Sequence, residues 1–158
     1  MDRKHETKVN YSDLQKRSTL RRPSYIVDVD GTLALMGDRS PYTFEKVLED
    51  KPNRPVVYAL QFLSIHYTVV IVTGRPEVAR TDTEMWLHKN YIIFNEVLMR
   101  KDKDFRPDAI VKEEIYLKHI KPFYTDILGV FDDRLSVIRM WESHGLFVFN
   151  CNNGKGEF

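Results

Sequence analysis

Tyr25-Ile26-Val27-Asp28-Val29-Asp30-Gly31-Thr32-Leu33 is the stretch that decides the fold of this chain. It begins as an apolar run typical of a buried strand, continues into two carboxylates one residue apart, and reaches a glycine at which the backbone can turn sharply. The Asp28 and Asp30 side chains point to opposite sides of an extended backbone, and a turn at Gly31 can swing the second acid back toward the first. Ligands of an open α/β sheet bind at the carboxyl ends of its strands. The stretch therefore predicts a site for Mg²⁺ and phosphate, although a strand that ends in a capped turn would show the same pattern.

The composition is that of one ordinary globular domain. The 158 residues are 42% hydrophobic and 30% charged, with no apolar run long enough to span a membrane and no secretory signal after Met1. Cys151 is the only cysteine, so an internal disulfide is excluded, and five scattered histidines show no zinc-ligand spacing. These features predict a cytoplasmic, reducing setting.

The charge is unevenly distributed along the chain. Residues 1–24 contain seven Lys or Arg and three acids, which gives a net charge of +4, whereas residues 25–158 carry −3. We expect residues 1–23 to form a basic, flexible tail and residues 24–158 to form the folded domain. A basic tail is compatible with nucleic-acid contact and equally with a solvated terminus, so its role stays open.

Apolar strands alternate with amphipathic helices along the domain. Strands are expected at 25–29, 67–73, 96–99, 127–131 and 146–149, and helices near 44–48, 56–64, 76–90, 107–120 and 135–144. Asn53 is expected to cap the second helix, with Pro55 in its first turn. The connections are too long for hairpins and favour right-handed βαβ units. The pattern predicts an α/β, Rossmann-like three-layer sandwich around a parallel sheet of about five strands.

Polar groups recur where further strands end or helices begin. They are Thr73-Gly74-Arg75 after the second strand, Asp108 with Lys112 four residues later on one helix face, and Asp132-Asp133-Arg134 after the fourth strand. Each alone has a simpler interpretation, as a helix cap or a surface ion pair. Together with the first stretch, at the ends of parallel strands, they predict one functional site.

This set of motifs resembles a known superfamily. DVDGTL, VTGR, DAIVKEE and FDDR resemble the four motifs of the haloacid dehalogenase-like phosphatases. The details resemble more closely the 3′-phosphatase domain of phage-type polynucleotide kinase/phosphatases. The residues that carry this closer resemblance are Asp30 to Ala34 followed by Arg39 and Pro41-Tyr42, the run Asp108 to Ile115, and Asp132 to Arg134 with Met140-Trp141. The resemblance covers residues 24–158 and implies a haloacid dehalogenase-like fold with a small cap or none.

The resemblance implies roles for the acidic residues. Asp28 is expected to be the nucleophile that forms an aspartyl-phosphate. Mg²⁺ is the expected cofactor, bound by the Asp28 carboxylate, the Asp30 main-chain carbonyl and the Asp132/Asp133 pair. Within that pair, Asp133 is favoured for direct contact and Asp132 for a supporting or water-mediated role. The Asp30 side chain is then expected to be free to protonate the leaving oxygen and to deprotonate the attacking water.

The remaining motif residues are expected to bind phosphate. Thr73 and Lys112 would hold the phosphoryl oxygens, and Asp108 would position Lys112. Arg39 and Arg75 are expected to bind substrate, because a guanidinium can bind phosphate through two bonds. Gly74, between Thr73 and Arg75, is expected to bind substrate with them. The simpler interpretation of Arg39 is a loop cation with no role.

The expected size of the substrate depends on how much of the chain is available to cover the site. Neither 34–66 nor 76–107 is long enough for a large cap domain, and an open site suits the end of a polymer. The predicted function is a Mg²⁺-dependent polynucleotide 3′-phosphatase that removes 3′-phosphate, or opens 2′,3′-cyclic phosphate, at DNA or RNA ends. The alternatives are a nucleotidase or small-ester phosphatase of the same superfamily, and a non-catalytic nucleic-acid-binding module.

The expected protein partners follow from a motif that the sequence lacks. The sequence has no GxxxxGK[ST] phosphate-binding loop, so kinase activity is not expected of this chain. A separate kinase or ligase is an expected partner, and a homo-oligomer stays open. If the chain is phage-encoded, its cytoplasmic location is that of the host cell.

Overall fold

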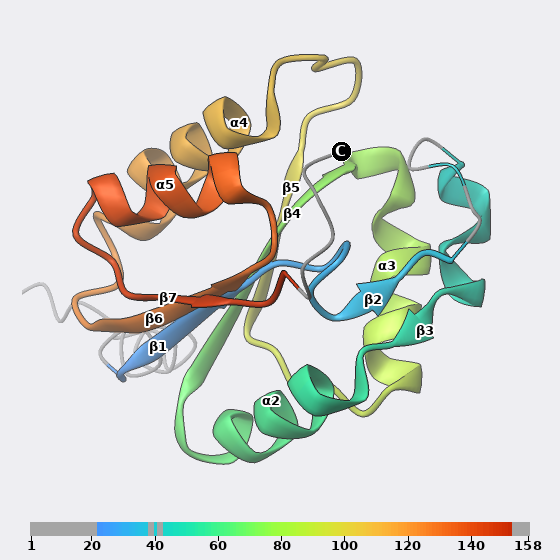
Figure 1. Ribbon diagram of the computed structural model, residues 1–158, viewed down its shortest axis with the longest axis horizontal. Helices are drawn as coiled ribbons and strands as arrows, with labels where there is room; N and C mark the ends of the chain where they lie inside the picture. Colours follow the sequence, from blue (N-terminus) through green and yellow to red (C-terminus); the bar gives the residue numbers. More distant parts are fainter. Residues whose placement is uncertain (1–21, 38–39, 41–42, 153–158) are drawn as a thin grey trace, which may run out of the picture.

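A five-stranded parallel sheet forms the centre of the molecule (Figure 1). The computed structural model describes residues 22–152 except 38–39 and 41–42. The strand order is β5-β4-β1-β6-β7. The strands are β1 (Ser24–Val27), β4 (Thr68–Pro76), β5 (Glu96–Arg100), β6 (Ile127–Asp132) and β7 (Val148–Asn150). The predicted parallel sheet is therefore confirmed.

Helices cover both faces of this sheet and complete three layers. The helices α2 (Arg54–His66) and α3 (Arg80–Lys89) lie on one side, and α4 (Asp108–Ile115) and α5 (Leu135–Ser143) lie on the other (Figure 1). Side chains alternate between the two cores, as strand geometry requires. Val27 packs with Leu60 and Trp86, whereas its neighbour Ile26 packs with Val111 and Trp141.

The order of the strands places β1 in the middle of the sheet, between β4 and β6. From β1 the chain continues to β4 and β5 on one side, and it returns to β6 and β7 on the other. Val27 pairs with Ile71 of β4 and with Phe131 of β6. Asp28 therefore leaves β1 between the ends of two neighbouring strands, at the point of the sheet where ligands of such folds bind.

Several local features differ from the sequence-based expectation. A two-stranded antiparallel ribbon of β2 (Ala34–Leu35) and β3 (Lys51–Pro52) was not predicted, because strands of two residues leave no periodic signal. Between them lies η1 (Phe44–Glu49), a 3₁₀ helix. Asn53 stands at the N-cap of α2 as predicted, but its side chain donates to the Thr32 carbonyl at 2.9 Å instead of capping the helix. This bond joins the ribbon to the turn that carries the first motif.

The predicted helices at 76–90 and 107–120 are each divided in two. The first consists of η2 (Glu77–Ala79) and α3, and the second consists of α4 and a π-helical turn, η3 (Tyr116–Ile120). The last strand, β7, begins two residues later than expected. None of these shifts moves a motif away from the carboxyl edge of the sheet.

Two further predictions concern membranes and the tail. Among the described residues, no helix is both long enough and apolar enough to cross a membrane. Most of the predicted basic tail, residues 1–21, lies outside the described residues. The same is true of Arg39 and of Pro41-Tyr42.

Candidate active site

The Lys112 ammonium joins the motif carboxylates at the carboxyl edge of the sheet. Its Nζ lies 2.8 Å from Asp28 Oδ1, 2.9 Å from Asp132 Oδ2 and 3.5 Å from Asp108 Oδ2. Asp28 follows β1 directly, and its backbone N–H donates to the Phe131 carbonyl at 2.9 Å, which extends the pairing with β6 by one residue. Lys112, Asp28 and Asp132 are all buried. The structure thus brings together the first, third and fourth motifs.

Three carboxylates form a group with the geometry of a metal site. Asp28, Asp132 and Asp133 each offer an oxygen, and these oxygens lie within 4.8 Å of one another. The Thr32 hydroxyl lies 3.3 Å from Asp28 Oδ2 and 3.2 Å from Asp133 Oδ1. Oxygen ligands are those that Mg²⁺ prefers, so the donor set fits this ion. The Asp30 side chain does not belong to the group, which is compatible with a main-chain role for Asp30.

Asp132 is held by more contacts than Asp133. In addition to Lys112, its Oδ2 accepts from Trp141 Nε1 at 3.3 Å, and its Oδ1 accepts from the Arg134 backbone N–H at 3.2 Å. Asp133 is only partly buried and accepts from the Thr32 hydroxyl. The arrangement leaves Asp133 the more accessible carboxylate, in keeping with the predicted division of roles between the two.

The electrostatics of this cluster are dominated by negative charge. Burial raises the pKa of Asp28 well above its ordinary value, and the carboxylates of Asp132 and Asp133 add to the rise against the opposing effect of Lys112. Burial also raises the pKa of Asp133. The Lys112 pKa is held well above its ordinary value because Asp132, Asp28 and Asp108 outweigh the effect of burial. A single ammonium shared among these carboxylates leaves net negative charge that a divalent cation would balance.

Two glycines are required by the close approach of the motif carboxylates. Gly31 has φ +86°, and a Cβ there would collide with the Asp133 carboxylate. A Cβ on Gly74 would collide with the Asp108 carboxylate. Gly74 was predicted to bind substrate, and the geometry gives it a steric role, which is to admit Asp108 beside β4.

The predicted role of Arg75 in binding substrate does not fit the structure. Its side chain is fully buried, with Nε 2.9 Å from Asp30 Oδ2 and Nη2 2.7 Å from Asp30 Oδ1. Nη2 also donates to Asp50 at 2.9 Å, and Nη1 donates to Thr83 at 3.2 Å. The guanidinium is thus occupied by protein groups and has no surface for a phosphate. By the same contacts, both oxygens of the Asp30 carboxylate are bound by Arg75, and the expected acid/base role of this side chain stays a prediction.

Thr73 and Arg100 complete the described edge of the site. Thr73 is fully buried in β4, and its Oγ1 accepts from the Arg75 backbone N–H at 3.2 Å. Arg100, at the end of β5, donates to the Gly74 carbonyl at 2.8 Å and pairs with Asp108 at 3.1 Å. The predicted strand ended at residue 99, so Arg100 was not among the expected site residues, although it stands at a strand end like the other motifs. Arg39, the remaining substrate-binding candidate, lies outside the described residues.

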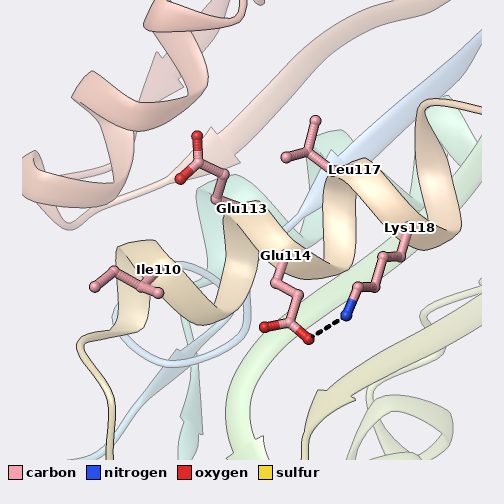
Figure 2. Close-up of a pocket in the computed structure, with 5 residues that line it drawn as sticks. All are labelled: Ile110, Glu113, Glu114, Leu117 and Lys118. Atoms are coloured by element: carbon pink, nitrogen blue, oxygen red, sulfur yellow. Dashed lines mark hydrogen bonds and ion pairs between the residues drawn. The ribbon is translucent and has the colours of Figure 1, made fainter.

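A hollow of about 310 Å³ on the outer side of α4 is separate from this cluster (Figure 2). Ile110, Glu113, Glu114, Leu117 and Lys118 line it, and Glu114 pairs with Lys118 across it. Lys112, on the same helix, is 1% exposed and reaches the carboxylates inside the protein. The hollow therefore contributes nothing to the candidate active site.

Comparison with known proteins agrees with this geometry. The family model described as "Polynucleotide kinase PNKP phosphatase domain" matches residues 22–158. A protein of Autographa californica nuclear polyhedrosis virus, named as a candidate bifunctional polynucleotide kinase/RNA ligase, is 31% identical over 138 residues. This match covers 84% of the present chain and 20% of the viral protein.

Solved structures give the same assignment. One structure of the Pnkp1/Rnl/Hen1 RNA repair complex is 35% identical with a TM-score of 0.78, over 82% of this chain and 42% of that one. Another is 34% identical with a TM-score of 0.82, over 86% and 48%. A haloacid dehalogenase-like hydrolase from Streptococcus pneumoniae, 13% identical with a TM-score of 0.56 over 84% and 85%, shares the fold.

The chain spans less than half the length of the curated relative and of the two repair-complex chains. The family model nevertheless matches nearly all of it, including every motif described above. The resemblance inferred from the motifs and the predicted class, a phosphoric monoester hydrolase, are confirmed at the level of the family. The chain belongs to the family of polynucleotide kinase PNKP phosphatase domains, within the haloacid dehalogenase-like fold.

Proposed function

We propose that this protein is a Mg²⁺-dependent polynucleotide 3′-phosphatase that acts through an aspartyl-phosphate on Asp28. The observation that carries the proposal is the position of Asp28, which leaves the central strand between the Lys112 ammonium and the Asp132/Asp133 pair. Lys112 aligns one carboxylate oxygen of Asp28 at 2.8 Å, and it offers a positive charge where phosphoryl oxygens would gather.

In the first step, an Asp28 carboxylate oxygen attacks phosphorus and the bond between phosphorus and the ribose 3′ oxygen breaks. Asp30 gives its proton to the leaving 3′ oxygen. In the second step, Asp30 takes a proton from a water molecule that attacks the phosphorus, which releases inorganic phosphate and restores Asp28. Arg75 holds Asp30 through both carboxylate oxygens and so fixes its direction.

The acidic group is the proposed Mg²⁺ site. Asp28, Asp132 and Asp133 would hold the ion, together with the Asp30 main-chain carbonyl. The bound ion would supply positive charge that lowers the repulsion between a carboxylate nucleophile and an anionic phosphate. Asp133 would contact the ion directly, and Asp132, already bonded to Lys112 and Trp141, would orient the site.

The proposed substrate is the 3′-phosphorylated end of RNA. Support comes from the names of the relatives, which mention an RNA ligase and an RNA repair complex. The small ribbon of β2 and β3 with η1, between the first motif and α2, is also compatible with a site open to a polymer end. We further propose that the protein works beside a ligase, which requires a free 3′-hydroxyl.

The proposal is tested by measuring phosphate release from a 3′-phosphorylated RNA oligonucleotide with and without Mg²⁺. The matching DNA, a 2′,3′-cyclic phosphate RNA, a 5′-phosphorylated RNA and a 3′-mononucleotide serve as comparison substrates. We expect Mg²⁺-dependent release from the 3′ end. Asp28→Asn should reduce this release by on the order of 10³-fold or more, because it removes the nucleophile.

Other outcomes assign the site differently. Release from the mononucleotide alone would contradict the proposal and place the substrate among nucleotides or small esters. Equal activity of Asp28→Asn and wild type would contradict the mechanism. Ser64→Ala, near the end of α2 and outside the carboxylate cluster, controls for handling of the variants and should leave release unchanged.

A further inference from the structure

Phe105 is the most exposed large hydrophobic side chain among the described residues, at 92%. It lies in the loop between β5 and α4, which projects beyond the carboxyl ends of the strands (Figure 1). Single exposed apolar residues are common and need no explanation by themselves. The hydrogen bonds and ion pairs that fix this loop to the active site, however, do call for an explanation.

The backbone on both sides of Phe105 is bonded to Arg100. Arg100 Nη1 donates to the Asp104 carbonyl at 2.9 Å and to the Arg106 carbonyl at 2.7 Å. The same guanidinium pairs with Asp108, which in turn pairs with Lys112. Phe105 is therefore connected to the proposed phosphate-binding lysine through two ion pairs.

Further contacts hold the loop from both of its sides. Asp102 accepts from the Val78 backbone N–H at 2.9 Å, which ties the loop to η2. Arg106 pairs with Asp104 at 2.6 Å and with Glu114 at 2.7 Å, which ties it to the outer side of α4 seen in Figure 2. A fixed loop presents its aromatic ring without a large cost in conformational entropy on binding.

The loop also carries two exposed lysines. Residues 100–107 contain four basic and two acidic side chains, but Arg100 is paired with Asp108, and Arg106 is paired with Asp104 and Glu114. Lys101 and Lys103 are exposed, and within the part of the chain that the structure describes neither forms a salt bridge. An exposed ring among cations is the combination that binds single-stranded nucleic acids, because bases stack on the ring and phosphates lie near the cations.

We propose that Phe105 stacks on a base close to the 3′ end of a single-stranded polynucleotide, with Lys101 and Lys103 supplying charge for its phosphates. The inference rests on the proposed function, since it takes the substrate to be a polynucleotide end. It adds a base-binding residue to a site whose other residues act on the phosphate. The contact is independent of sequence, because every base offers a face for stacking.

The test compares wild type with Phe105→Ala, Phe105→Trp and a matched control, Phe62→Ala. Phe62 is 68% exposed on α2, and that helix ends at His66, shortly before the start of β4, so it lies toward the amino ends of the strands. The substrates are a 3′-phosphorylated single-stranded RNA, a 3′-phosphorylated single strand without bases at its last two positions, and p-nitrophenyl phosphate. Binding of a fluorescein-labelled single-stranded RNA is measured beside them by fluorescence anisotropy.

We expect Phe105→Ala to raise KM for the RNA, and Kd for the labelled strand, by about tenfold, the scale of one lost stacking contact. Phe105→Trp and Phe62→Ala should behave like wild type. The difference between Phe105→Ala and wild type should disappear on the strand without terminal bases and be absent on p-nitrophenyl phosphate.

Equal RNA KM and Kd for Phe105→Ala and wild type would overturn the inference and leave the ring as a surface for a protein partner. An equal loss on p-nitrophenyl phosphate would also overturn it, since it would show a structural effect on the site. If wild type releases no phosphate from RNA, the proposed function fails. The anisotropy comparison then decides the stacking contact separately.

Discussion

Arg75 and Asp30 form a two-point ion pair in which Nε and Nη2 of the guanidinium each bind one oxygen of the carboxylate, at 2.9 Å and 2.7 Å. The remaining donors of Arg75 reach Asp50 and Thr83. Asp50 belongs to the segment between η1 and β3, and its carbonyl accepts from Trp86 Nε1 at 2.8 Å. The proposed acid/base is therefore held by a buried network that connects β4, α3 and the small ribbon.

Arg75→Lys should reduce kcat by about a hundredfold and change KM little. A lysine ammonium cannot make the two-point contact, and a small displacement of a catalytic group costs about this much. Steady-state kinetics on a 3′-phosphorylated oligonucleotide measure both constants. Arg80 forms a partly exposed ion pair with Glu77, three residues before it. Arg80→Lys is therefore the control, and its kcat and KM should stay near those of wild type. A raised KM with an unchanged kcat would instead support direct contact between Arg75 and the substrate.

Gly74→Ala should damage activity through Asp108. The added Cβ would displace the Asp108 carboxylate, which pairs with both Arg100 and Lys112. Asp108→Ala removes that carboxylate and makes room for the methyl group. The double variant should therefore be no less active than Asp108→Ala alone, a non-additivity that a double-mutant cycle detects. Additive losses would show that Gly74 acts by another route, such as direct contact with the substrate.

Mg²⁺ should raise the melting temperature of the wild-type protein, because an ion that binds only the folded state stabilises it. Asp133→Asn should reduce the shift, and Asp126→Asn, outside the acidic group, should leave it unchanged. Differential scanning fluorimetry at several Mg²⁺ concentrations measures this without any substrate. A full shift in Asp133→Asn would exclude Asp133 as a ligand.

The same shift should depend on pH in a direction set by Asp28 and Asp133. Burial raises the pKa of both carboxyl groups, so they take up protons at a higher pH than ordinary aspartates. Protons then compete with Mg²⁺ for these oxygens. Stabilisation by Mg²⁺ should therefore begin to decline at a pH above the ordinary aspartate pKa. A shift that stays constant down to pH values near the ordinary aspartate pKa, about 4, would contradict the assignment.

The single cysteine should react slowly with alkylating reagents. Burial, with the nearby carboxylates of Asp133 and Asp132, raises the pKa of Cys151 to about 12. The thiolate is the reactive form, and a rise of about three units lowers its fraction at pH 8 by on the order of 10³. Iodoacetamide labelling followed by mass spectrometry measures the rate, and the urea-unfolded protein provides the reference. Equal rates in the folded and unfolded states would contradict the raised pKa.

Site residues could be predicted from the sequence where the pattern of one strand or one helix is enough to recognise them. Asp28 follows an apolar strand, and the spacing of Asp108 and Lys112 places them on one face of a helix, so their meeting at the carboxyl edge follows from the fold class. Arg75 was misjudged for the opposite reason. Its partners Asp50 and Thr83 come from elements that pack beside β4 only in the folded protein, and no spacing in the sequence links them to Arg75. The two-residue strands β2 and β3 were missed because they are shorter than any detectable period.

The sharing of one ammonium by distant carboxylates has a consequence for protein synthesis. Asp28 lies 84 residues before Lys112 in the chain, and Asp132 lies 20 residues after it. A growing chain on the ribosome therefore cannot assemble the nucleophile, the lysine and the acidic pair until β6 has emerged and joined β1. Phosphatase activity should therefore appear only after β6 has left the ribosome, so a chain that stops before β6 would not remove phosphates from nucleic acids.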